Sequence, residues 1–396
     1  MSSQTNKKAT MPPEEELALG TDPIPAKPYY CPDFFALERE AIFKRTWLQV
    51  GHMSELPEAG SFIVREVDIA NASILITRGK DDQVRAFHNV CTHRGTQLVS
   101  QKDGTAATFT CPYHAWTFTD KGDLRAAPDF ERFYTDKSQC SLPKVSIAVC
   151  AQLIFINLDP TPTQSLQEYL GPLAAELETL TVAHATHFSE YVYEIDANWK
   201  LSYDNFQENY HLRFIHPRSG EAASGPDNPF GYPVKYGFED PHRTQTIWHN
   251  PGFQPKPTQG FAMGKAVEFA LASGVVNIEN AKQYYALFPN FFALGSPTQP
   301  FTHCIMPIAP NKSRGVIRIY WVGEDQSATQ RFSREYNTAT AMDIHAEDRS
   351  VIEAGQRGLD SGALKHIHFQ SQEVLCRHLY TQVERYVTAY QQEQSA

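Results

Sequence analysis

Two short segments, each with one cysteine and one histidine, constrain the fold of this chain more than any other feature. They contain Cys91 and His93 in the first segment, and Cys111 and His114 in the second, with 17 residues between the two pairs. Turn residues such as Gly95 surround them, so we expect two separate tight loops. A structural zinc finger pairs Cys with Cys and His with His, whereas here each loop offers one thiolate and one imidazole.

This interleaved order suits two iron atoms with unlike ligands. In a two-iron, two-sulfur cluster of the Rieske type, two Cys hold one iron and two His hold the other. The neutral imidazoles raise the reduction potential above that of an all-Cys cluster, so such a centre accepts electrons readily. The alternatives are a zinc knot and four unrelated residues in a β domain. The chain has seven Cys and no signal sequence, which does not indicate a disulfide framework.

A second group of metal-ligand residue types follows in residues 198 to 217, which read NWKLSYDNFQENYHLRFIHP. We expect a helix from about 198 to 213, with Asp204, Glu208 and His211 along one face. His216 lies about 140° off that face in a regular helix, so both imidazoles can meet one metal only if the helix ends between them. Pro217 provides such an end, because the residue before a proline is disfavoured in helical geometry. Two His plus one carboxylate is the facial triad of non-haem Fe(II) oxygenases.

The carboxylate of such a triad must come from elsewhere, and residues 342 to 359 (MDIHAEDRSVIEAGQRGL) offer several. Asp348 shares one face of a predicted helix with Ile352 and Gln356, but on composition alone Asp343, Glu347 and Glu353 compete with it.

A carboxylate-bridged di-iron bundle is a second interpretation of Glu208 and His211, and it requires two Glu-x-x-His motifs. The other such motif, Glu239 to His242, has Pro241 inside it, which disfavours the bundle.

Three runs give the chain a family resemblance: NVCTHRGTQL, CPYHAWTF with GDLRAAP shortly after, and EDRSVIEAGQRGL. They resemble the oxygenase (alpha) components of Rieske non-haem iron oxygenases, from about residue 28 to 360. The resemblance implies an α+β fold in which a small antiparallel β Rieske [2Fe-2S] domain is inserted in a helix-grip-like catalytic domain. It also implies a mononuclear Fe(II) held by His211, His216 and Asp348, with the cluster held by Cys91, His93, Cys111 and His114.

The same resemblance implies a homotrimer in which the cluster of one subunit passes electrons to the mononuclear iron of its neighbour. By position Glu208 resembles the carboxylate that bridges the two metals through their His ligands. Many ring-dihydroxylating members carry Asp at this position. The Glu here is more similar to the branch that acts on quaternary ammonium compounds such as carnitine, glycine betaine and stachydrine, and CPYHAWTF and DNFQENYH favour the same branch.

The pattern along the chain predicts four parts. Residues 1–27 are a polar leader, 28–50 a helical start of the catalytic domain, 51–160 the Rieske domain with short alternating strands, and 161–396 the catalytic domain. In the last part we expect helices at 165–188, 327–357 (closing at Gly358) and 369–390, strands at 189–197, 300–307 and 315–323, and a loop-rich stretch at 217–262.

Composition limits the partners. A net charge of −10 argues against nucleic acid, and no apolar run approaches the roughly 20 residues that span a bilayer. The leader lacks an apolar signal core, so we expect a cytoplasmic protein. The chain has neither a dinucleotide-binding glycine loop nor a four-Cys ferredoxin pattern. A separate NAD(P)H-dependent flavin reductase, with or without a ferredoxin, is therefore expected to supply electrons.

Three functions follow from these patterns. The leading one is O₂-dependent hydroxylation or N-demethylation of a small molecule, with a quaternary ammonium compound favoured. The others are ring hydroxylation of an aromatic or alicyclic acid, and electron transfer by a Rieske carrier without catalysis. Aromatic side chains near the predicted iron site would suit either a quaternary ammonium or a ring: Tyr203, Phe206, Tyr210, Phe214 and Trp248.

Overall fold

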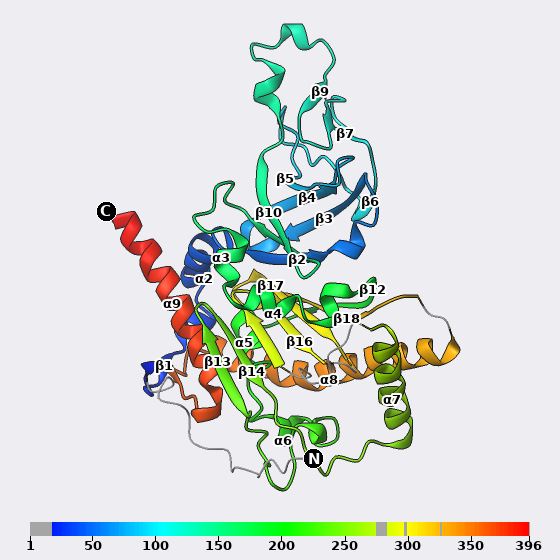
Figure 1. Cartoon of the computed structure of the whole chain (residues 1–396). Helices are drawn as coiled ribbons and strands as arrows, with labels where there is room; N and C mark the ends of the chain where they lie inside the picture. The colour runs from blue at the N-terminus through cyan, green and yellow to red at the C-terminus, as the bar shows by residue number, and fades with distance from the viewer. Residues whose placement is uncertain (1–17, 275–282, 297–298, 325–326, 396) are drawn as a thin grey trace. The chain divides into compact units, whose positions relative to one another are not determined.

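The computed structural model describes residues 18–274, 283–296, 299–324 and 327–395. The chain forms two compact units: the small unit, Arg39–Ala174, and the large unit, which consists of the residues up to Glu38 and those from Ala175 onward (Figure 1). The first 17 residues of the predicted leader lie outside the described residues. No helix within the described ranges is long and apolar enough to cross a membrane.

The small unit is an antiparallel β structure. Its seven-stranded sheet has the order β2(Leu48–His52), β11(Leu153–Asn157), β10(Lys144–Cys150), β5(Val84–His88), β4(Ala72–Arg78), β3(Ser61–Val67), β6(Asp103–Thr105). A three-stranded sheet contains β7(Thr108–Thr110), β8(Thr117–Thr119) and β9(Leu124–Ala126). Strands β3, β4 and β11 form at the short alternating or β-branched runs SFIVREV, ASILITR and QLIFINL, as the sequence predicted.

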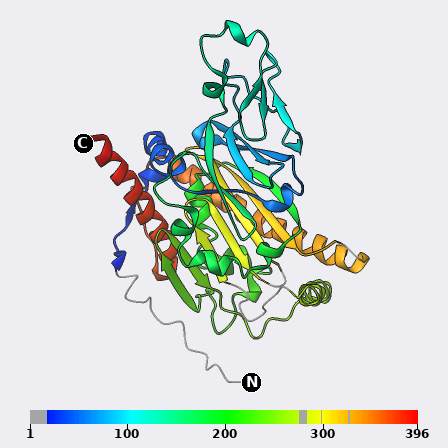
Figure 2. The same ribbon diagram turned by 45° about the horizontal axis from the view of Figure 1, so that its top comes forward.

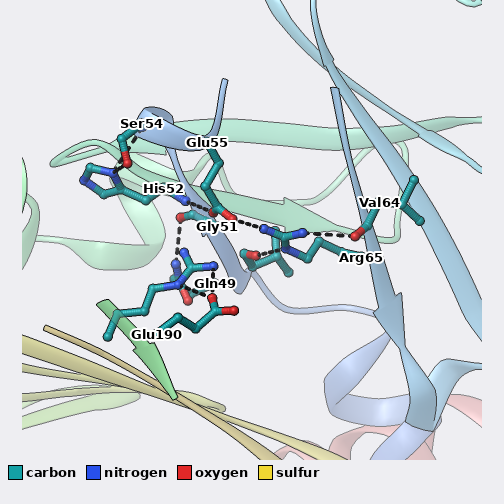
Figure 3. Close-up of polar contacts among 10 residues, drawn as sticks. Gln49, Gly51, His52, Ser54, Glu55, Val64, Arg65 and Glu190 are labelled. Atoms are coloured by element: carbon teal, nitrogen blue, oxygen red, sulfur yellow. Dashed lines mark hydrogen bonds and ion pairs between the residues drawn. The ribbon is translucent and has the colours of Figure 1, made fainter. Parts of the chain in front are cut away.

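A polar network fixes the turn between β2 and β3 in the small unit. Glu55 accepts a hydrogen bond from the backbone N–H of His52 (2.9 Å) and forms an ion pair with Arg65 (Figure 3). The Arg65 guanidinium also donates to the carbonyls of Val50 (2.7 Å) and Val64 (3.0 Å). Two half-buried backbone carbonyls at this bend are thereby satisfied by one side chain.

The large unit is built on a second seven-stranded antiparallel sheet. Its order is β12(His187–Ile195), β18(Lys312–Trp321), β17(Phe301–Ala309), β16(Phe291–Gly295), β15(Gln283–Leu287), β14(His242–Thr246), β13(Lys235–Glu239). Its helices are α2(Pro32–Glu38), continued by a π-helical turn that opens the small unit, α5(Trp199–Asp204), α6(Leu212–Ile215), α7(Pro257–Ala272), α8(Ala328–Asp360) and α9(Val374–Ser395). Two short helices, α3(Leu166–Leu170) and α4(Leu173–Leu177), lie around the end of the small unit.

Helix α8 covers one face of this sheet (Figures 1 and 2). Its buried residues include His345, Asp348, Ile352 and Gln356, so the predicted face is the one that turns inward. Ile352 packs with residues from β12 and β18 in one core cluster: Tyr193, Ile195, Ile317 and Ile319. Gln356 anchors the helix, because its amide accepts from the Asn198 backbone N–H (2.8 Å) and donates to the Tyr29 carbonyl (3.2 Å).

Four sequence predictions were wrong in detail. The helix predicted for 165–188 is divided into α3, α4 and a 3-10 turn at Thr181–His184, because Gly171 takes a positive φ (+54°), and β12 already begins at His187. Strands β13 and β14 lie inside the stretch predicted to be loop-rich, because a polar sequence such as HRTQT is buried by its strand neighbours and lacks an alternating hydrophobic pattern. Helix α8 passes Gly358 and ends at Asp360. The helix predicted for 198–213 ends at Asp204 and resumes only as the single turn α6.

Candidate metal centres

The two Cys–His segments of the small unit form loops with the same backbone hydrogen bonds. The N–H of Cys91 donates to the carbonyl of Thr96, and the N–H of Cys111 to that of Trp116, both at 2.8 Å. The fifth residue of each loop donates back to the cysteine carbonyl, Gly95 at 2.9 Å and Ala115 at 3.1 Å. Gly95 (φ +77°) and Ala115 (φ +57°) both occupy the left-handed region.

These loops bring the four predicted ligands together. Cys91 and Cys111 are buried, and the rings of His93 and His114 lie 4.6 Å apart at 70° to each other. Burial raises the pKa of the Cys91 thiol, the backbone N–H groups of His93 and Arg94 lower it, and the neighbouring Cys111 thiol raises it further. Backbone donors aimed at a cysteine sulfur are the arrangement that stabilises a cluster thiolate.

The surroundings of the histidines fit a metal cluster as well. Nδ1 of His93 is buried and has no hydrogen-bond partner within the described part of the chain. The ring of His93 stacks on Trp116 (4.9 Å, 10°) and meets the edge of Phe133 (5.4 Å), so apolar rings fix its orientation. A buried nitrogen without a partner is costly unless a ligand or metal satisfies it, and a metal satisfies an imidazole nitrogen directly.

The second predicted site lies on the irregular segment between α5 and α6 in the large unit. The carboxylate of Glu208 accepts from the backbone N–H groups of Tyr210 and His211, the latter at 3.2 Å. The Asn209 side chain donates to the carbonyl of Gly231 (2.7 Å). Side chains that bind nearby backbone groups compete with helical hydrogen bonds, which explains why the predicted helix is interrupted here.

Asp204 therefore does not share a helical face with Glu208 and His211. It is buried and accepts hydrogen bonds from the Tyr29 hydroxyl (2.9 Å) and the Gln207 amide (3.2 Å). Burial raises the pKa of its carboxyl group to about 7. Asp204 is thus part of the packing behind the site.

His211, His216 and Asp348 meet at one point. Their ligand atoms lie within 4.8 Å of one another, the only such group of three or more among the described residues. Asp348 Oδ1 lies 2.8 Å from His216 Nε2 and 3.5 Å from His211 Nε2. This oxygen is buried without a hydrogen bond of acceptable geometry, which fits three ligands aimed at a common metal. His216 caps the end of α6, as the position of Pro217 predicted.

Two further carboxylates support the imidazoles from behind. Glu208 Oε1 contacts His211 Nδ1, and Glu347 Oε2 lies 2.7 Å from His216 Nδ1. Ser219 donates to the same Glu347 oxygen (2.6 Å). A carboxylate on the far nitrogen fixes the ring and the tautomer that presents Nε2 to a metal. Sequence reasoning treated Glu347 only as a competing ligand, although it directly precedes Asp348.

The other competitors lie away from the histidines. Glu353 pairs with Arg349 (2.9 Å), and Asp343 is exposed on α8. Of the aromatic candidates, Phe206 packs against His303 (4.4 Å between ring centroids). The exposed rings of Tyr210 and Phe214 pack with Phe230, and Trp248 is half-buried beyond β14. The buried Tyr203 donates to the carbonyls of Leu287 and Phe291 and so serves the packing of the sheet.

Comparison with known proteins agrees with the presence of a Cys–His site in the small unit and a His–His–Asp site in the large unit of one chain. The model of the Rieske [2Fe-2S] domain matches residues 46–146, and that of the ring hydroxylating alpha subunit (catalytic domain) matches residues 182–389. A β domain with two Cys–His loops and a catalytic domain with two His and a carboxylate define an iron-dependent oxygenase. The chain belongs to the Rieske oxygenase family, as an oxygenase (alpha) subunit.

Individual relatives and structures extend the comparison. The carnitine monooxygenase oxygenase subunit of Escherichia coli (strain K12) is 31% identical over 345 residues, which cover 85% of this chain and 84% of that protein. The quaternary ammonium Rieske monooxygenase CntA with L-carnitine matches at a TM-score of 0.74 and 25% identity over 95% of this chain and 99% of that one. Naphthalene 1,2-dioxygenase from Rhodococcus sp. shares the fold, with a TM-score of 0.74 and 22% identity over 98% and 99%.

Membership in this family defines the general chemistry of the chain. It is an oxidoreductase with a [2Fe-2S] cluster in its Rieske domain and a non-haem iron in its catalytic domain. It uses O₂ and a substrate, and a separate reductase provides the electrons.

Proposed function

We propose that the chain oxidises a small quaternary ammonium compound, by hydroxylation or N-demethylation. The observation that carries this proposal is the 31% identity over 84% of the length of a carnitine monooxygenase oxygenase subunit. The presence of Glu at position 208, in the place where the sequence resembles the quaternary ammonium branch, supports it independently.

We assign His211, His216 and Asp348 as the ligands of the mononuclear iron, and Cys91, His93, Cys111 and His114 as the ligands of the cluster. The convergence of the first three side chains supports the first assignment, and the unpartnered Nδ1 of His93 supports the second. An iron held by these three side chains would supply the activation of O₂ beside the substrate. Glu208 and Glu347 hold the two imidazoles in the ligating tautomer.

The reaction that we propose consumes one O₂, two electrons and two protons for each substrate. One oxygen atom enters an N-methyl C–H bond, and the other leaves as water. The hydroxymethyl ammonium then loses formaldehyde and a proton, which leaves the demethylated amine. We also propose a homotrimer, with Glu208 beside His211 as the carboxylate through which electrons arrive from a neighbouring subunit's cluster.

A substrate panel tests the function. The purified oxygenase is supplied with a generic NAD(P)H-dependent flavin reductase, and O₂ uptake and formaldehyde release are followed for quaternary ammonium compounds, tertiary amines and aromatic acids. Formaldehyde formed in proportion to O₂ from a quaternary ammonium compound supports the proposal. Oxidation of aromatic or alicyclic acids alone favours ring hydroxylation. Reduction of the cluster without any O₂ uptake favours an electron carrier.

A further inference from the structure

A second group of buried polar side chains lies beside the proposed iron ligands and takes no part in holding them. It consists of Tyr193 on β12, His303 on β17 and His345 on α8. His303 is fully buried, and 1% of His345 is exposed. His345 precedes Asp348 by one turn of α8, so the two side chains lie on the same face of the helix.

Tyr193 and His303 contact each other across an intervening strand. The hydroxyl of Tyr193 lies 2.5 Å from Nε2 of His303, although β18 separates β12 from β17. Residue 315 of β18, the direct partner of Tyr193, is a glycine. A Cβ at this position would lie 2.0 Å from Cζ of Tyr193, so only the absence of a side chain lets the phenol cross the strand. This hydrogen bond fixes the ring of His303.

Three imidazole nitrogens in the group have no partner within the described residues: Nδ1 of His303 and both nitrogens of His345. Burial lowers the pKa of His345 to about 4, and that of His303 well below its usual range, so both rings are uncharged near neutral pH. A neutral imidazole has one N–H donor. Buried donors without an acceptor are rare in folded proteins and indicate a ligand or a bound water.

The neighbours of these nitrogens are aromatic. Phe206 lies 4.4 Å from His303 and 6.5 Å from His345, measured between ring centroids, and Phe292 packs against Phe206 (6.2 Å). Tyr284 packs on Phe292 (4.7 Å) and is close enough to Asp348 for that carboxylate to raise the pKa of its phenol. The surroundings thus combine aromatic faces, which attract a quaternary ammonium, with two neutral imidazoles. When the Tyr193 hydroxyl donates to Nε2 of His303, the hydrogen of that ring lies on Nδ1, and each imidazole then offers one N–H donor. A quaternary ammonium cannot accept from these donors because its nitrogen has no lone pair.

We propose that His303 and His345 are specificity-determining residues, because their side chains receive the carboxylate of a zwitterionic quaternary ammonium substrate. This inference rests on the function proposed above. Two N–H donors match the oxygens of one carboxylate, and hydrogen bonds to a charged acceptor are stronger than those to a neutral one. Tyr193 acts as a positioning residue through its bond to His303.

The distances suit a small zwitterion. His345 stands about 4.5 Å along α8 from Asp348, because three residues of helix rise by that amount. The rings of His345 and His303 are 6.2 Å apart. A carboxylate between them can therefore stand a few bonds away from an N-methyl group at the proposed iron.

The test compares two substrates in the reconstituted holoenzyme. One is a trimethylammonium carboxylate, and the other is an alkyltrimethylammonium of the same length without the carboxylate. We expect His345→Phe and His303→Phe to reduce kcat/KM for the carboxylate roughly tenfold to a hundredfold, mainly through KM, and to change it less than about twofold for the alkyl compound. Tyr193→Phe should reduce kcat/KM for the carboxylate by a smaller factor. His345→Gln keeps a hydrogen-bond donor and should therefore retain most of the wild-type kcat/KM for this substrate.

Cluster absorbance and iron content, measured for every variant, verify that both metal sites remain. His187→Phe, at an exposed position at the start of β12, is the matched control and should leave kcat/KM unchanged for both substrates. Equal losses for both substrates, or no loss for either, would overturn the carboxylate site, the latter because water then satisfies the nitrogens. A wild-type enzyme that oxidises neither compound would overturn the proposed function together with this inference.

Discussion

The two proposed metal centres are built in opposite ways. In the small unit, the ligand loops are closed by their own backbone hydrogen bonds, from Cys91 to Thr96 and from Cys111 to Trp116. In the large unit, His211 and His216 lie on an irregular segment, and Asp348 comes from a helix more than 130 residues later. Local hydrogen bonds specify the first site, whereas long-range packing specifies the second. The difference predicts how each site responds to substitution.

The largest effect is expected from the cluster. The wild-type protein should be brown and should bind three irons and two acid-labile sulfides per chain. Cys91→Ser should remove the cluster absorbance and all turnover, because no other thiolate can replace the ligand. The mononuclear iron should remain, since its site lies in the other unit. Cys140→Ser is the matched control, because Cys140 is buried in the same core and its thiol faces the Asp136 carbonyl. Zinc without sulfide in the wild type would contradict the cluster assignment.

The second prediction concerns the long-range site. Asp348→Ala, like His211→Ala or His216→Ala, should abolish product and release the mononuclear iron, while the Rieske spectrum stays intact. Metal analysis and visible absorbance, measured on the same sample, distinguish loss of the mononuclear iron from loss of the cluster. Glu353→Ala, five residues further along α8, is the control and should retain iron. Retention of iron in Asp348→Ala with its loss in Glu353→Ala would show the ligand assignment to be wrong.

A third, smaller effect should distinguish the roles of Glu208 and Glu347, the two carboxylates that support the imidazoles. Glu208→Gln should leave iron content and cluster reduction normal and slow the oxidation of the reduced cluster in single-turnover experiments. Glu347→Gln makes the same chemical change on His216 and should instead weaken iron binding about tenfold, with transfer to the loaded iron unchanged. If Glu208→Gln lost its iron, Glu208 would be a ligand, and undiminished transfer would exclude it from the electron path.

The smallest effect tests the equivalence of the two cluster loops. Gly95 and Ala115 occupy the same left-handed backbone position, and nothing lies within 4 Å of a Cβ added at Gly95. Gly95→Ala should therefore cost about 1 kcal/mol through backbone strain alone, and Ala115→Gly should cost less or stabilise the loop. Thermal unfolding of the holoprotein measures both. A larger loss of stability in Gly95→Ala, together with loss of the cluster, would mean that the first loop does not accept a side chain at the position where the second loop carries Ala115.

The same contrast explains what could be predicted from the sequence. Cys91, His93, Cys111 and His114 could be predicted as ligands because their spacing within two loops carries the information, and the structure brings their loops together. The interruption after Asp204 could not, because it depends on the side chains of Glu208, which binds the backbone N–H groups that follow it, and Asn209, which binds the Gly231 carbonyl. Strands β13 and β14 were missed for a similar reason, since pairing with neighbouring strands forms them without an alternating hydrophobic pattern in their own sequences. The roles of two residues beside Asp348 were overlooked: Glu347, which directly precedes it, and His345, which lies three residues before it on the same face of the helix.

The anchoring of α8 by Gln356 has a mechanical consequence. A helix is stiff along its axis, so a slide by one residue would move Asp348 about 1.5 Å relative to both imidazoles. The bonds of Gln356 to Asn198 and to Tyr29 oppose that slide and act as an axial stop. The stop stands about 12 Å from Asp348 along the helix, eight residues away. The position of Asp348 relative to His211 and His216 is thus set by an anchor at Gln356, which is remote from both imidazoles.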